Sequence, residues 1–151
     1  MKKITLLLAV VMAGMFMLNS CGKYEEGPSF SILGKTSRIT GVWKIDKMIV
    51  NNVEQTITEE FGAVRFELMK DGKGKVIYSF GGLSINVNLE WKFNSDKTHV
   101  SMRMQDITDT TVWGEWVESE ILRLTNKELW VKESDTDGGV TTETITHFSK
   151  V

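Results

Sequence analysis

The sequence predicts an all-β fold, an antiparallel up-and-down β-barrel of about eight strands. In the segment Leu83–Phe93, six apolar residues alternate strictly with five polar ones, as in a strand with one buried face. The only proline, Pro28, lies near the N-terminus and leaves the rest of the chain free to form hydrogen-bonded strands. Short turn-forming links favour antiparallel pairing of neighbouring strands. Eight such strands can close without exposed edges, and a two-sheet sandwich is the structural alternative.

The first twenty residues have the pattern of a secretory signal peptide. Lys2 and Lys3 precede about fifteen apolar residues that end at Leu18. This segment is shorter than the roughly 20 residues that a membrane-spanning helix needs. We therefore expect residues 1–20 to be removed from the mature protein.

The single cysteine, Cys21, follows this segment directly. As a nucleophile it would need a general base held nearby by the fold, and as half of a disulfide it has no partner. The tetrapeptide Leu18-Asn19-Ser20-Cys21 resembles the lipobox of bacterial lipoproteins. The resemblance implies acylation of the thiol, cleavage before Cys21 and acylation of the new amino group. Several acyl chains, palmitate among them, would then anchor the protein lastingly in a membrane.

The stretch Lys23-Tyr24-Glu25-Glu26 resembles the export signal that follows the acylated cysteine in lipoproteins of the Bacteroidota. There it directs the protein to the cell surface, and an ordinary charged tether is the alternative. We expect a protein that is lipid-anchored at the outer membrane, and the export signal would expose it on the cell surface. Residues 21–37 are small and polar and predict a flexible tether, and residues 38–151 predict one barrel domain.

Within this domain the predicted strands are rich in β-branched and aromatic residues, and glycine, asparagine or aspartate marks the links between them. In chain order they cover residues 42–50, 63–70, 75–80, 83–93, 98–105, 111–124, 129–133 and 140–150. The links include Asp71-Gly72-Lys73-Gly74 and Gly81-Gly82, which suit tight turns. Helix-period segments long enough to cover a sheet do not occur in this sequence.

The first predicted strand opens with Gly41-Val42-Trp43, which resembles the G-x-W motif of lipocalins. The stretch ILRLTNKELWVKE, followed by a glycine-bearing hairpin, resembles the last strands of the lipocalin-like domain in Bacteroidota lipoproteins. The resemblance implies a calycin-type barrel that Gly41 and Trp43 close at one end. In lipocalins a late arginine often covers this tryptophan, and here Lys150 or Arg123 would have to take its place.

Charge and motifs argue against several function classes. Loss of two lysines with the signal peptide leaves 16 basic and 20 acidic residues, a mature net charge of −4, so nucleic acid is not an expected partner. His99 and His147 lie on separate predicted strands, and we expect neither a metal nor another cofactor. Glu118 and Glu120 share a strand face and could pair as glycosidase carboxylates do, although a solvated surface is the commoner role. We expect a monomer that is not an enzyme.

The favoured function is binding of a small apolar or amphipathic ligand inside the barrel. The alternative is a non-enzymatic protein–protein interaction module of a surface complex. Inward-facing aromatic and methionine side chains would suit an adaptable cavity, but the same stripe would also build a filled core, and both remain open. The candidate ligand-binding residues are Phe66, Leu68, Tyr78, Val87, Leu89, Trp91, Met102, Met104, Trp113 and Trp116.

Two members of this set, Trp113 and Trp116, pose a separate question. They are three positions apart, so a regular strand places them on opposite faces, one buried and one at the surface. A bulge at Gly114 would instead bring both rings to one side, where they could stack on a sugar or clamp a flat apolar ligand.

Overall fold

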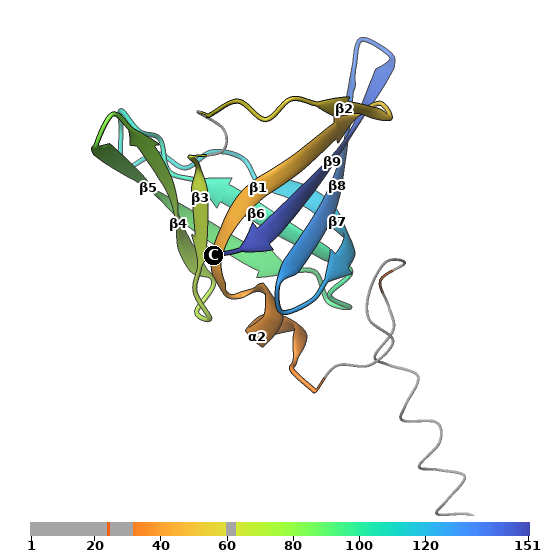
Figure 1. The fold of residues 1–151 in the computed structure, drawn as a ribbon, viewed down its shortest axis with the longest axis horizontal. Helices are drawn as coiled ribbons and strands as arrows, with labels where there is room; N and C mark the ends of the chain where they lie inside the picture. Colours follow the sequence, from red (N-terminus) through yellow and green to blue (C-terminus); the bar gives the residue numbers. More distant parts are fainter. Residues whose placement is uncertain (1–23, 25–31, 60–62) are drawn as a thin grey trace, which may run out of the picture.

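A computed structural model describes Tyr24, residues 32–59 and residues 63–151 (Figure 1). Cys21, the predicted signal peptide and most of the predicted tether lie outside the described residues, so the anchor and export signal stay predictions. In the described part of the chain, no helix has the length and apolar character needed to cross a membrane.

The described residues form one antiparallel sheet that closes on itself. Eight strands make the ring, because β1 and β3 to β9 pair in chain order and β9 returns to pair with β1. The strands are β1 (Gly41–Val50), β2 (Val53–Gln55), β3 (Arg65–Leu68), β4 (Lys73–Phe80), β5 (Leu83–Phe93), β6 (His99–Met104), β7 (Val117–Leu124), β8 (Glu128–Asp137) and β9 (Val140–Lys150). The predicted all-β antiparallel barrel is confirmed.

Several strand boundaries differ from the prediction; β8, for example, ends at Asp137 and not at residue 133. The largest difference is at the start of β7, and it has a local reason. The expected strand 111–124 begins only at Val117, since Asp106 and Asp109 accept hydrogen bonds from the backbone N–H groups of the residues that follow them and so stabilise a loop. The short strand β2 was not predicted. It forms a hairpin with the end of β1 through Asn51 and Asn52, whose positive φ angles of 48° and 65° suit a tight two-residue turn.

The alternating segment of β5 faces inward as predicted, but only part of it is covered. Val87, Leu89 and Trp91 are buried, whereas Leu83 is 76% exposed. Figure 1 shows the reason, because the end of the β4–β5 hairpin leans away from the other strands. The apolar face of this hairpin therefore continues beyond the closed part of the barrel.

The helix α2 (Lys35–Ile39) and Trp43 close one end of the barrel. Trp43 is fully buried, and its Nε1 donates a hydrogen bond of 2.7 Å to the carbonyl of Ile39. The Lys150 Nζ lies 4.7 Å from the centroid of the Trp43 ring and donates to the carbonyls of Arg38 and Thr40. Of the two residues considered for this covering position, Lys150 occupies it.

Tyr24 lies against this closed end although it precedes the barrel. Its side chain is buried, with 7% of the residue exposed, and its hydroxyl donates a 2.7 Å hydrogen bond to the carbonyl of Lys97. The Lys35 Nζ lies 4.3 Å from the Tyr24 ring centroid. Burial, the largest influence, raises the pKa of Tyr24 to about 12, so the hydroxyl keeps the proton that it donates.

Candidate ligand cavity

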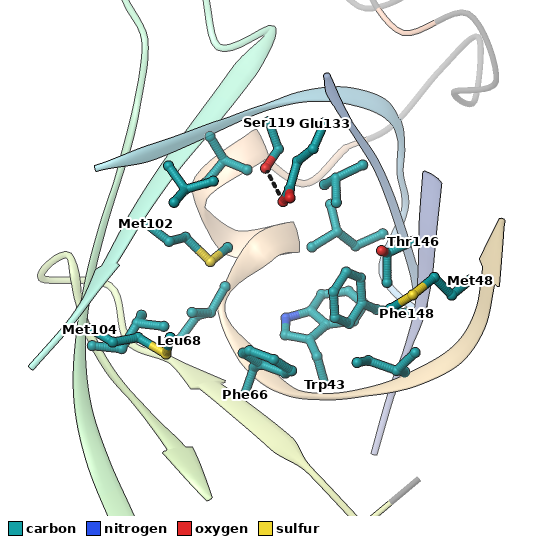
Figure 2. A pocket seen from close by; sticks show the side chains of 16 residues that line it. Trp43, Met48, Phe66, Leu68, Met102, Met104, Ser119, Glu133, Thr146 and Phe148 are labelled. Carbon is teal, nitrogen blue, oxygen red and sulfur yellow. Dashed lines mark hydrogen bonds between the residues drawn. The ribbon is translucent and has the colours of Figure 1, made fainter. Parts of the chain in front are cut away.

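A cavity of about 270 Å³ lies inside the barrel, and Figure 2 shows the side chains around it. Seven of the eight ring strands contribute to its wall, β4 being the exception. Most of the wall is apolar and includes Trp43, Ile45, Met48, Phe66, Leu68, Leu89, Val100, Met102, Met104, Val117, Leu129, Val131 and Phe148. The interior is thus hollow.

The cavity ends at the closed side of the barrel on completely packed side chains. Trp43 and Val100 have no exposed surface, and Leu129 is nearly as buried. Phe66 and Phe148 meet edge to face with ring centroids 5.5 Å apart, which holds both rings in place. The deep part of the cavity is therefore apolar and closely packed, as ligand sites usually are.

Polar side chains enter the wall from three neighbouring strands. The Ser119 hydroxyl on β7 donates a 2.8 Å hydrogen bond to Oε1 of Glu133 on β8, and Thr146 on β9 lies in the same wall (Figure 2). Glu133 continues the inward-facing series of Leu129 and Val131 at period two, and it is exposed where the barrel opens. Sequence reasoning missed this set, although the alternation of β8 carried the signal for Glu133.

A second hollow, of about 340 Å³, adjoins the first at Met104, which lines both. Its other walls come from the inner face of the β4–β5 hairpin and from the loop after β6. These residues are Tyr78, Phe80, Ile85, Val87, Gln105 and Ile107. The exposed apolar face of β4–β5 thus borders a hollow next to the main cavity.

The structure gathers seven of the ten candidate ligand-binding residues around these two hollows. Phe66, Leu68, Leu89, Met102 and Met104 line the main cavity, and Tyr78 and Val87 line the second hollow. Trp91 lines neither. It is buried near the closed end, where its Nε1 donates to the carbonyls of Met69 and Lys73, at 2.9 and 3.1 Å.

Trp113 and Trp116 also line neither hollow. Both rings do come to one side, but it is the outer face of the barrel, where the Arg103 guanidinium carbon lies 4.9 and 4.8 Å from their centroids. Arg103 alternates with the inward-facing Met102 and Met104 and therefore points outward. Its contacts with both rings hold the two tryptophans against the barrel wall rather than in the cavity.

The titratable side chains weighed from the sequence lie outside the cavity. Glu120 forms an ion pair of 2.8 Å with Lys132, and the neighbouring Glu118 is exposed. His147 stacks on Trp130 at a centroid distance of 4.1 Å, and burial lowers its pKa. Within residues 32–59 and 63–151, with Tyr24, no group of three or more His, Cys, Asp or Glu side chains is arranged to hold a metal ion.

Comparison with known proteins finds similarity at the level of solved structures. No protein-family model matches the chain, and no curated protein matches it. The odorant-binding protein from bovine nasal mucosa is 17% identical, with 81% of this chain and 77% of that chain covered and a TM-score of 0.45. The complex of bovine odorant-binding protein with undecanal gives the same values. The bovine lipocalin allergen Bos d 2 is 14% identical, with 77% and 75% covered and a TM-score of 0.43.

Proposed function

We propose that this chain is a lipid-anchored outer-membrane protein whose barrel binds a small apolar or amphipathic molecule. The observation that supports ligand binding is the cavity of about 270 Å³, whose wall is apolar at all but three residues. Apolar surface that a ligand buries there contributes roughly 25 cal/mol per Å² before the cost of association is subtracted. The few polar atoms at the open side would set the orientation of the ligand.

The wall combines rigid and adaptable parts in a way that suits such a role. The packed pair of Phe66 and Phe148 fixes one side. Met48, Met102 and Met104 are long, unbranched and polarizable, so they can adjust to ligands of different shape. The cavity would therefore accept related amphiphiles by changes in the methionine side chains, while Phe66 and Phe148 stay in place.

Native mass spectrometry tests ligand binding directly. The chain from Gly22 onward would be produced in the periplasm and purified without detergent. We expect a discrete additional mass that is lost on denaturation, or uptake of added medium-chain amphiphiles. A Met102→Trp variant, which places a large ring in the cavity, should lose this mass. A chain that stays empty and takes up no amphiphile would contradict the proposal.

The anchor and the location form the second part of the proposal. The pattern that ends at Cys21 supports acylation, and the stretch that follows it supports the surface-exported lipoprotein type of the Bacteroidota. Labelling with a palmitate analogue should mark the wild-type chain and not a Cys21→Ala variant. Protease added to intact cells should degrade the protein if it is on the surface, whereas a periplasmic control protein should survive.

One observation favours the alternative, an interaction module. Leu83, Phe80 and Ile85 at the end of the β4–β5 hairpin are exposed and apolar, and such patches often mark protein interfaces. A Leu83→Asp variant distinguishes the two functions. It should abolish co-purification of a partner if the hairpin is an interface, and it should leave uptake of amphiphiles by the cavity unchanged.

A further inference from the structure

We propose that the cavity selects amphiphiles with a cationic head group, such as an alkylammonium, over those with an anionic one. This inference rests on the proposed function, since it specifies the class of ligand that the same cavity takes. Glu133 carries it, because among the described residues this carboxylate is the only charged side chain that lines the cavity.

Glu133 is placed so that a bound head group would meet its charge. It follows Leu129 and Val131 on the inward face of β8, and it lies where the apolar wall gives way to the opening. Ser119, which is buried, donates its hydroxyl hydrogen to Oε1 and orients the carboxylate. Among the residues that the structure describes, Glu133 has no ion-pair partner, so its charge is not offset by a cation of the protein.

Beyond Glu133, the inward-facing residues of β8 and their partners on β9 add no positive charge. Asp135 and Asp137 follow on the same face of β8, and the residues that pair with these three positions on β9 are Thr144, Thr142 and Val140. The nearest lysine of this strand, Lys132, lies on the outer face and pairs with Glu120. An anion that approached the opening along β8 would therefore meet like charges.

The rest of the opening suits the apolar part of such a ligand. Met102 and Met104 on β6 and Val117 on β7 line the cavity, and the second hollow continues from Met104 along the β4–β5 hairpin. In Figure 2 the two methionines and Leu68 lie on one side of the cavity, and Glu133 with Ser119 lies at its edge. A chain in contact with the methionines can thus place its head group beside Glu133.

The sign of the charge decides between head groups of equal size. An alkylammonium is protonated at neutral pH and would form a charge-assisted hydrogen bond with the Glu133 carboxylate. A fatty-acid carboxylate would be brought close to a like charge, and this repulsion raises its free energy, the more so the lower the local dielectric constant. An alcohol can donate a hydrogen bond without a charge and should lie between the two.

The test compares decylamine, decan-1-ol and decanoate, which share a chain and differ in the head group. The full chain, as the cell processes it, is held in nanodiscs of a neutral lipid, with its methionine methyl groups labelled for NMR. Met102 and Met104 report occupancy of the cavity, and Met69, which is outside its wall, serves as the internal reference. We expect decylamine to bind about tenfold more tightly than decanoate, with decan-1-ol between them.

Two variants isolate the contribution of Glu133, and a third reverses its charge. Glu133→Gln keeps an acceptor for Ser119 and should reduce the preference for the amine by about tenfold. Glu118→Gln removes the same charge from the outer face of the adjacent strand and should leave the preference unchanged. Glu133→Lys should reverse the order, so that decanoate binds more tightly than decylamine.

The outcomes separate the two proposals. If decan-1-ol shifts the Met102 and Met104 signals but the amine has no advantage over decanoate, the head-group inference is overturned and the ligand cavity stands. The head-group inference is overturned in the same way if Glu133→Gln and Glu118→Gln behave alike. If none of the three probes shifts these signals, the ligand-binding function itself fails, and the head-group inference fails with it.

Discussion

Replacement of Trp43 by phenylalanine should destabilise the barrel strongly, because Trp43 holds the closed end together. The indole is fully buried, donates to the carbonyl of Ile39 at 2.7 Å and lies under the Lys150 Nζ at 4.7 Å. Phenylalanine keeps an aromatic ring but removes the N–H donor and part of the buried volume. The variant therefore tests the closing contacts while it preserves the apolar character of the site.

The magnitude follows from the contacts that are lost. Loss of the donor to a buried carbonyl costs about 1–3 kcal/mol. A weaker cation–π contact with Lys150 removes up to about 1 kcal/mol more, and the smaller ring adds a packing loss. We expect the free energy of unfolding to fall by about 2–4 kcal/mol, a large share of the 5–15 kcal/mol that is typical of a domain.

Urea unfolding of the chain from Gly22 onward measures this loss as a change in midpoint at constant slope. Trp130→Phe is the matched control, since Trp130 lies on the outer face against His147 and should cost about 1 kcal/mol. A double-mutant cycle with Lys150→Met isolates the interaction of the lysine with the ring. The reasoning is refuted if Trp43→Phe costs no more than Trp130→Phe.

Three further predictions concern other parts of the barrel. Gly74→Ala should cost about 1–3 kcal/mol in urea unfolding, because the added Cβ would collide with the backbone carbonyl of Glu67; an unchanged midpoint would contradict this. Because the pKa of Tyr24 is raised to about 12, its contribution to stability is complete below pH 10 and is lost as the pH rises through about 12. Tyr24→Phe should therefore reduce the loss of unfolding free energy between pH 10 and 12, and an equal loss in the variant would exclude this cause. Arg103→Met should lower the free energy of unfolding by about 1–2 kcal/mol, because it removes the ion pair with Glu90 and the contacts with the Trp113 and Trp116 rings. Binding of amphiphiles to the cavity should be unchanged, and weaker binding would place Arg103 and the two tryptophans in the ligand site.

The barrel could be predicted from the sequence because strand periodicity and turn chemistry are local signals. The alternation of Leu83–Phe93 and the glycine-rich links define strands that must pair antiparallel. The resemblance of Gly41-Val42-Trp43 to the G-x-W motif predicted that Trp43 lies at the closed end under a basic side chain. The choice of Lys150 for its cover could not be made from the sequence, since it depends on where β9 ends beside β1, and Trp43 pairs with Lys150 only in the folded register.

The cavity was harder to predict than the fold. A row of inward-facing apolar residues specifies which side chains face the interior but not whether their volumes fill it. Trp113 and Trp116 were misleading because the loop before β7 carries them around the outside, onto Arg103. Glu133 went unnoticed because a carboxylate at the end of an alternating series is expected at the surface, and only the closed barrel shows that this exposed residue also lines the cavity.

The position of Tyr24 against the closed end of the barrel bears on how the molecule would be oriented at a membrane. Tyr24 is three residues after Cys21, so even a fully extended chain separates the two residues by at most about 11 Å. If Cys21 is acylated as proposed, the closed end formed by α2 and Trp43 would be held next to the bilayer, and the opening beside Glu133 would point away from it. A ligand would then enter the barrel from the aqueous side and not from the lipid bilayer.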